Sequence, residues 1–260
     1  MNATNDWNPN LYLKFKDERT QPSIDLVTKI KTTHDPGSII DIGCGPGNST
    51  QVLFQRWPNA KVTGLDNSPA MIDKAKHDFP DQTWIIADAG TFTSQTKFDL
   101  VFSNATIQWV PNHSQLLKNL SDLLKPDGIL AIQIPMFWDM PIGQSIDKVA
   151  CNPEWKSHTD GVKDLFTIHD YHFYFDVLSS IFPVVDMWET FYMHVLDSQE
   201  SILEMIRSTG LKPYLERLTR ETDKQKFESE VFSSIKKDYP VQKNGKVIFP
   251  FKRLFFIGYK

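Results

Sequence analysis

Residues 40–50 ("IDIGCGPGNST") hold three glycines within five positions, directly after a short apolar run. Glycine lets a backbone turn tightly and come close to a ligand. Asn48, with Gln51 three residues later, has the spacing of a capped helix start. The segment therefore predicts a strand at 38–42, a ligand-binding loop and a helix whose first amides point at the ligand.

Strands and helices then alternate along the chain. The apolar pattern predicts strands at 60–65, 82–87, 98–102 and 129–134, with helices around 68–79 and 116–124 between them. This alternation is typical of an α/β fold with a doubly wound, mostly parallel sheet. Beyond it we expect a helix at 171–181, a strand at 184–195, a helical insertion at 198–246 and a last strand at 252–259.

Composition limits the class of protein. A chain of 260 residues can bury one large core, so we expect a single domain over 1–260. The formal net charge of −4, with scattered lysines, argues against a nucleic-acid partner. We see no signal peptide and no apolar run of membrane-spanning length, which predicts a cytoplasmic protein without a membrane partner. The two cysteines, Cys44 and Cys151, and the histidines lack metal-ligand spacing, so we predict no metal.

The glycine loop discriminates between ligand classes. A nucleotide-binding P-loop needs lysine where Asn48 stands, and a dinucleotide loop needs its third glycine at that same position. Both phosphate-binding interpretations are weakened. A small nucleoside-like ligand remains, with its polar or positive part against the loop and the carboxylate of Asp41.

Two more acids follow the next predicted strands. Asp66 ends the second strand, where a carboxylate accepts hydrogen bonds from ribose hydroxyls. Asp88 follows the third strand and is placed to accept from an adenine amino group beside the Ala89 amide. An isolated aspartate after a strand is more often a solvated turn residue, but three on consecutive strand ends favour a ligand site.

Together, Asp-x-Gly-x-Gly-x-Gly, the acid ending the next strand and Asp-Ala after the third resemble the class I S-adenosylmethionine-dependent methyltransferases. The resemblance implies S-adenosylmethionine as cofactor, S-adenosylhomocysteine as product, and a seven-stranded sheet whose last strand is antiparallel. It implies a cofactor-binding core at 31–134. The expected cofactor residues are Asp41, Gly43, Gly45, Asn48, Asp66, Asn67, Met71, Asp88, Ala89 and Asn104.

Segments outside that core extend the resemblance: "DWNPNLYLKFKDERTQP" (6–22), "NATIQWVPNH" (104–113), "STGLKPYLERL" (208–218) and "RLFF" (253–256). They resemble the branch that esterifies a carboxylate of a small tricarboxylic acid such as trans-aconitate. An N-terminal lid at 1–30 and a substrate-side cover at 135–170 are expected. Arginines suit carboxylates because their fork binds both oxygens; Trp109 and Trp138 have core packing as an alternative role. The expected substrate-binding residues are Tyr12, Arg19, Trp109, Trp138, Arg207, Tyr214 and Arg253.

The chemistry needs no acid–base residue. A carboxylic acid is ionised at neutral pH, whereas a phenol or amine acceptor needs a general base. The turn at 103–106 ("SNAT") differs from the Asn/Asp-Pro-Pro-aromatic turn of enzymes that methylate amino nitrogens, so we predict catalysis by positioning alone. Two alternatives stay open: methylation of another carboxylate, such as a malonyl group on a carrier protein, and a non-catalytic cofactor-binding protein. Either a monomer or a homodimer is compatible with the sequence.

Overall fold

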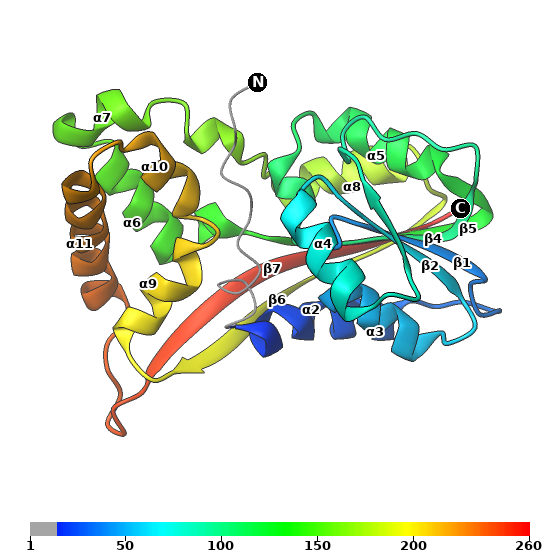
Figure 1. Cartoon of the computed structure of the whole chain (residues 1–260), viewed down its shortest axis with the longest axis horizontal. Coiled ribbons are helices and arrows are strands. Elements are labelled where there is room, and N and C mark those ends of the chain that lie inside the picture. The colour runs from blue at the N-terminus through cyan, green and yellow to red at the C-terminus, as the bar shows by residue number, and fades with distance from the viewer. Residues whose placement is uncertain (1–14) are drawn as a thin grey trace. The chain divides into compact units, whose positions relative to one another are not determined.

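The structure, a computed structural model, describes residues 15–260 and contains a seven-stranded sheet of order β3-β2-β1-β4-β5-β7-β6 (Figure 1). The predicted α/β class is confirmed: the sheet is mostly parallel, with antiparallel pairing at β7 and β6. The strands are β1 (Ser38–Ile42), β2 (Lys61–Asp66), β3 (Thr83–Ile86), β4 (Phe98–Asn104), β5 (Leu124–Pro135), β6 (Val184–Leu196) and β7 (Val247–Tyr259).

The register of the parallel strands brings their carboxyl ends together. On β1, Asp41 lies opposite Gly64 of β2 on one side and Phe102 of β4 on the other. Strand β4 in turn pairs in parallel with β5. Because β1, β2 and β4 run in the same direction, the residues that follow them emerge at one edge of the sheet, where open α/β folds bind ligands.

The chain divides into two compact units. The first contains the described residues up to Ile134, together with 169–189 and 254–260. In it α2 packs with α3 and α5 packs with α8, and Figure 1 shows these pairs on opposite faces of the sheet. Its helices are α2 (Lys16–Lys29), α3 (Asn48–Arg56), α4 (Pro69–Asp78), α5 (His113–Asp122) and α8 (Tyr171–Ser179), and η1 (Ile107–Trp109) is a 3₁₀ turn.

The second unit comprises residues 135–168 and 190–253. It contains most of the predicted cover (135–170) and all of the predicted insertion (198–246). The Tyr214 ring stacks on Phe227 with centroids 5.9 Å apart, and the Trp155 indole N–H donates to Glu230 at 2.8 Å. These contacts join α10 and α7 to α11. The unit contains α6 (Pro141–Ala150), α7 (Pro153–Thr159), α9 (Gln199–Arg207), α10 (Lys212–Arg217) and α11 (Glu221–Asp238), with 3₁₀ turns η2 (Phe137–Asp139) and η3 (Lys163–Leu165).

Two strands begin earlier than predicted. Strand β5 starts at Leu124, which pairs with Phe98, and residues 125–128 form an irregularity inside the strand, with Asp127 at φ +61°. Strand β7 starts at Val247 and continues through Pro250, which has no N–H to donate. The local sequence pattern did not predict these extensions, which result from pairing with a neighbouring strand.

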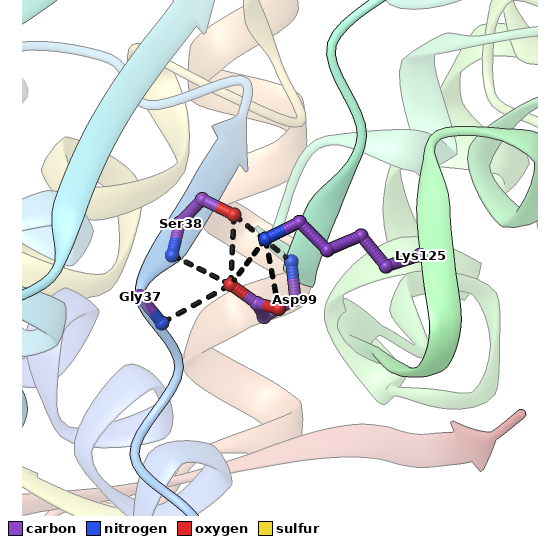
Figure 2. A network of polar contacts seen from close by, with 4 residues as sticks. All are labelled: Gly37, Ser38, Asp99 and Lys125. Atoms are coloured by element: carbon purple, nitrogen blue, oxygen red, sulfur yellow. Dashed lines mark hydrogen bonds and ion pairs between the residues drawn. The ribbon is translucent and has the colours of Figure 1, made fainter.

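The amino ends of β1 and β4 are joined by a network of polar contacts around Asp99 (Figure 2). Its Oδ2 accepts from the amides of Gly37 and Ser38, at 3.1 and 2.8 Å, and from the Ser38 hydroxyl at 2.8 Å. The Lys125 ammonium lies 3.0 Å from both carboxylate oxygens. Burial raises the pKa of Asp99, but the bonds from Lys125 and Ser38 outweigh it and hold that pKa below its usual value.

Two features of the described residues concern metal ions and membranes. Between residues 15 and 260, no three histidine, cysteine, aspartate or glutamate side chains gather in a way that would hold a metal ion. Within the same range, every helix is too short or too polar to cross a membrane.

Candidate cofactor site

At three positions of the loop between β1 and α3 the backbone has a positive φ, which only glycine adopts without strain. Gly43, Gly45 and Gly47 have φ values of +70°, +54° and +96°. The amides of Gly43 and Cys44 both donate to the Leu65 carbonyl, at 2.7 and 2.9 Å, which ties the loop to the end of β2. No heavy atom lies within 4 Å of a Cβ built on Gly45, so the backbone there faces open space.

Asp41, at the end of β1, is fully buried. Its Oδ2 accepts hydrogen bonds from the hydroxyls of Ser49 and Thr50, each at 2.7 Å, in the first turn of α3. Its Oδ1 is buried and has no hydrogen-bond partner within residues 15–260. Burial raises the pKa of Asp41 to about 6, although the hydrogen bonds from the two hydroxyls lower it. A buried carboxylate with a vacant acceptor atom suits a cationic ligand.

Asp66 and Asp88 lie where the sequence predicts. Asp66 accepts from the Gly45 amide through Oδ2 and from the Ser68 amide through Oδ1, both at 2.9 Å. It therefore fixes the glycine loop to the end of β2. Asp88 is exposed and accepts from the Gly90 amide at 2.7 Å, so its carboxylate remains accessible.

The other expected cofactor residues differ in exposure. Asn67 is exposed, Asn48 and Ala89 are half-buried, and Met71 is buried at 3% exposure within α4. The Nδ2 atom of Asn48 is buried and lacks an acceptor among the described residues. It is a donor beside the glycine loop, which suits a carboxylate group.

The end of β4 and the turn after it contribute further buried amide groups. Asn104 donates weakly from Nδ2 to the Arg19 carbonyl at 3.5 Å, and its Oδ1 has no donor within residues 15–260. Gln108, which the sequence analysis did not select, is 5% exposed, and its Oε1 likewise has no donor in that range. The sequence offered one indication of its role, a glutamine between the apolar residues Ile107 and Trp109.

Two expected substrate residues lie in the first unit, and a third falls outside the description. Arg19 is half-buried on α2, and Trp109 is half-buried at the end of η1, its amide bonded to the Thr106 carbonyl at 3.0 Å. Tyr12 and most of the predicted lid precede residue 15 and lie outside the described residues.

The second unit holds the other four. Trp138 packs edge-on against Phe166 at 5.2 Å, and the Lys163 ammonium lies 5.1 Å from its ring. Tyr214 is 1% exposed, and its hydroxyl lacks a partner among residues 15–260. Substrate contact by these two residues stays a prediction.

Arg207 and Arg253 differ sharply in environment. Arg207 is exposed and forms a two-bond fork with Glu228, at 2.6 and 3.0 Å. Arg253 is 5% exposed, and its guanidinium carbon lies 4.6 Å from the centre of the Phe251 ring. Burial, and secondly the charge of Arg253, lower the pKa of His194 to about 4. Substrate contact by either arginine stays a prediction.

Known proteins resemble this chain in sequence and in fold. Residues 40–132 match the family described as methyltransferase domain. Phosphoethanolamine N-methyltransferase 2 of Haemonchus contortus, solved with S-adenosyl-L-methionine, superposes with a TM-score of 0.60 at 16% identity, covering 97% of this chain and 56% of that one. Coclaurine N-methyltransferase gives 0.57 at 16% identity, covering 94% and 73%. These structures share the fold.

Sequence relatives extend over nearly the whole chain. A protein of Escherichia coli O157:H7 (strain EC4115) is 39% identical over 253 residues, 97% of this chain and 98% of its own length. One of Shigella dysenteriae serotype 1 is 38% identical with the same coverage. The chain belongs to the class I S-adenosylmethionine-dependent methyltransferases, and S-adenosylmethionine is its cofactor. Both relatives carry the name trans-aconitate 2-methyltransferase, to which this chain is therefore similar from end to end.

The residues present fit that cofactor. Its methionine part carries an ammonium and a carboxylate beside the sulfonium, and the loop offers the vacant acceptor of Asp41 together with the vacant donor of Asn48. A glycine backbone facing open space accommodates close approach.

Proposed function

We propose that this protein is an S-adenosylmethionine-dependent O-methyltransferase that esterifies a carboxylate of a small polycarboxylic acid, with trans-aconitate as the substrate. The observation that carries the proposal is the 39% identity over 97% of the chain to trans-aconitate 2-methyltransferase. A protein sharing only a cofactor core would align over little more than residues 40–132. The alignment instead includes most of the second unit, where four of the seven expected substrate residues lie.

The cofactor supplies an electrophilic methyl group when bound. We assign Asp41 and Asn48 to its methionine part, the carboxylate of Asp66 to the ribose, and Asp88 with the Ala89 amide to the adenine. The hydrogen bonds that the Asp66 carboxylate accepts from the Gly45 and Ser68 amides hold it toward the loop before a ligand arrives. This limits the entropy that is lost when a ligand binds.

Residues 104–113, at the end of β4 and in the turn after it, contain no free base, which supports a carboxylate as the acceptor. In the segment 104–113 the only titratable side chain is His113, which is 1% exposed. Its Nδ1 lies 2.7 Å from the Tyr174 hydroxyl and its Nε2 lies 2.8 Å from the Ile107 carbonyl. With both ring nitrogens engaged, His113 does not take a proton from a substrate, and an acceptor that is already ionised needs no such step.

A polyanionic substrate also requires cationic groups. Arg253 is the strongest candidate, because a guanidinium buried against aromatic rings is little hydrated and binds a carboxylate through two parallel bonds. Arg207 already offers its fork to Glu228, so a substrate would have to compete with that carboxylate.

The test is turnover. The protein is incubated with methyl-labelled S-adenosylmethionine and a panel of di- and tricarboxylic acids, and products are assayed for base-labile methyl esters. We expect trans-aconitate to give the highest kcat/KM, and Arg253→Lys to raise KM more than Arg207→Lys does.

The other outcomes are informative. Ester formation only on a malonylated carrier protein would replace the substrate class. Cofactor binding without any ester would favour a non-catalytic binding protein.

A further inference from the structure

Gln108 is a buried side chain with a fixed orientation and an unused acceptor atom. It lies in the 3₁₀ turn after β4 and is 5% exposed. Its Nε2 donates to the Ala105 carbonyl at 2.6 Å. Because that carbonyl only accepts, the amide is not reversed, and the vacant atom is the oxygen Oε1. A buried acceptor without a donor within residues 15–260 costs free energy that a ligand donor would recover.

The turn that holds this amide lies against the glycine loop. Thr106 donates from Oγ1 to the Gly43 carbonyl at 3.1 Å. The Gln108 amide donates to the carbonyl of Ala105, the residue before Thr106. Ala105 has φ +54°, a left-handed conformation that costs a non-glycine residue energy and is concentrated at functional sites. Its amide is bonded to the Gln133 carbonyl at 2.9 Å, which fixes the strained residue to β5.

A second network fixes the other side of the turn. The Ile107 carbonyl accepts, so His113 carries its proton on Nε2, and its Nδ1 accepts from the Tyr174 hydroxyl. Burial lowers the pKa of His113, which keeps this arrangement neutral. The turn is therefore held from α5 and α8 before any ligand binds.

We propose that Gln108 Oε1 is a binding acceptor for the ammonium of the cofactor's methionine part, shared with Asp41 Oδ1 and Asn104 Oδ1. Asp41 lies near the carboxyl end of β1, Asn104 is the last residue of the adjacent strand β4, and Gln108 lies in the turn after it. All three oxygens are buried and lack donors within the described residues. An ammonium has three N–H donors and a positive charge, so it satisfies all three where a hydroxyl would satisfy one. The inference rests on the cofactor site of the proposed function and is independent of which acid is methylated.

The test compares two ligands on matched variants. S-adenosylhomocysteine carries the amino-acid part, whereas 5′-methylthioadenosine lacks it. In Gln108→Met, which keeps the side-chain length, we expect calorimetry to show the Kd of S-adenosylhomocysteine raised about tenfold or more and that of 5′-methylthioadenosine changed by less than about twofold. The control is Gln115→Met on α5, an exposed glutamine, for which both Kd values should remain unchanged.

A measurement on the unsubstituted protein keeps the proposal testable if Gln108→Met does not fold. In ¹⁵N spectra, the Gln108 side-chain amide signal should shift on addition of S-adenosylhomocysteine and stay in place with 5′-methylthioadenosine. Equal loss of both ligands in the variant, or equal shifts with both, would overturn the assignment. Failure of carboxylate methylation would leave these binding results unaffected, so the two proposals are tested separately.

Discussion

The Thr106 side chain occupies the space in which a Cβ on Gly43 would have to lie. A Cβ built there would be 2.1 Å from both Cγ2 and Oγ1 of Thr106. The same hydroxyl donates to the Gly43 carbonyl at 3.1 Å. The missing side chain of Gly43 thus lets the segment after β4 pack directly on the cofactor loop.

This contact predicts a difference between two glycines. Gly43→Ala should lower the free energy of unfolding by about 2–5 kcal/mol, because a left-handed alanine costs roughly 1–2 kcal/mol and overpacking roughly 1–3 more. Gly45→Ala, with φ +54° but nothing within 4 Å, should lose only the conformational part while still weakening cofactor binding. Denaturant unfolding and calorimetry measure the two effects. Equal stability losses would contradict the proposed crowding at Gly43.

Asp41→Asn should raise stability and weaken cofactor binding. The pKa of Asp41 is raised to about 6, mainly by burial, from a reference of 3.8, so the folded protein binds the proton more tightly than the unfolded chain. Stability therefore falls as pH rises from 3.8 to about 6 and stays reduced above, by on the order of 3 kcal/mol. Without cofactor, the asparagine variant should unfold at a higher temperature at pH 8, and the difference should shrink toward pH 5.

The same carboxylate should make cofactor binding depend on pH. If the ionised form of Asp41 holds the ammonium, the affinity for S-adenosylhomocysteine should fall below about pH 6 in the unsubstituted protein. Asp41→Asn should remove that dependence. A pH-independent Kd between 5 and 8 would count against the role of Asp41.

Asp66→Ala should weaken cofactor binding by on the order of 1.5–3 kcal/mol, the scale of a hydrogen bond to a charged group. It should also destabilise the loop, because the amides of Gly45 and Ser68 lose their acceptor. Asp73→Ala, at an exposed position on α4, is the control and should change neither quantity. Titration calorimetry with S-adenosylhomocysteine distinguishes the two variants.

The Asp99 network predicts a stability effect without a change in binding. Asp99→Ala removes the acceptor for two backbone amides and should cost about 2–4 kcal/mol, whereas Lys125→Met removes only a half-exposed ion pair and should cost about 1 kcal/mol or less (Figure 2). Because the pKa of Asp99 is lowered, its contribution is present above the unfolded pKa and is lost as pH falls. Both variants should keep their cofactor Kd, since Asp99 lies at the opposite ends of the strands.

Much of the first unit could be predicted from local sequence. The apolar run before Gly43, the Ser68-Pro69 helix start and the acid after each strand depend on short-range rules of capping, turn chemistry and hydrophobic period. These rules predicted strands β1 to β4 to within a few residues, and the parallel sheet that follows from them is confirmed. Asp41, Asp66 and Asp88 lie at the strand ends where the pattern predicted them.

Tertiary structure decided what local patterns could not. The early starts of β5 and β7 follow from pairing with neighbouring strands, which outweighs the turn residues inside them. Three facts depend on the folded backbone and not on the sequence pattern: Asp41 Oδ1 has no partner within residues 15–260, the Ala105 carbonyl orients Gln108, and Arg207 is paired with Glu228. Residue types and their spacing predicted which groups belong to the cofactor site. Only packing and hydrogen bonding across the fold determined which of their atoms remain available to a ligand.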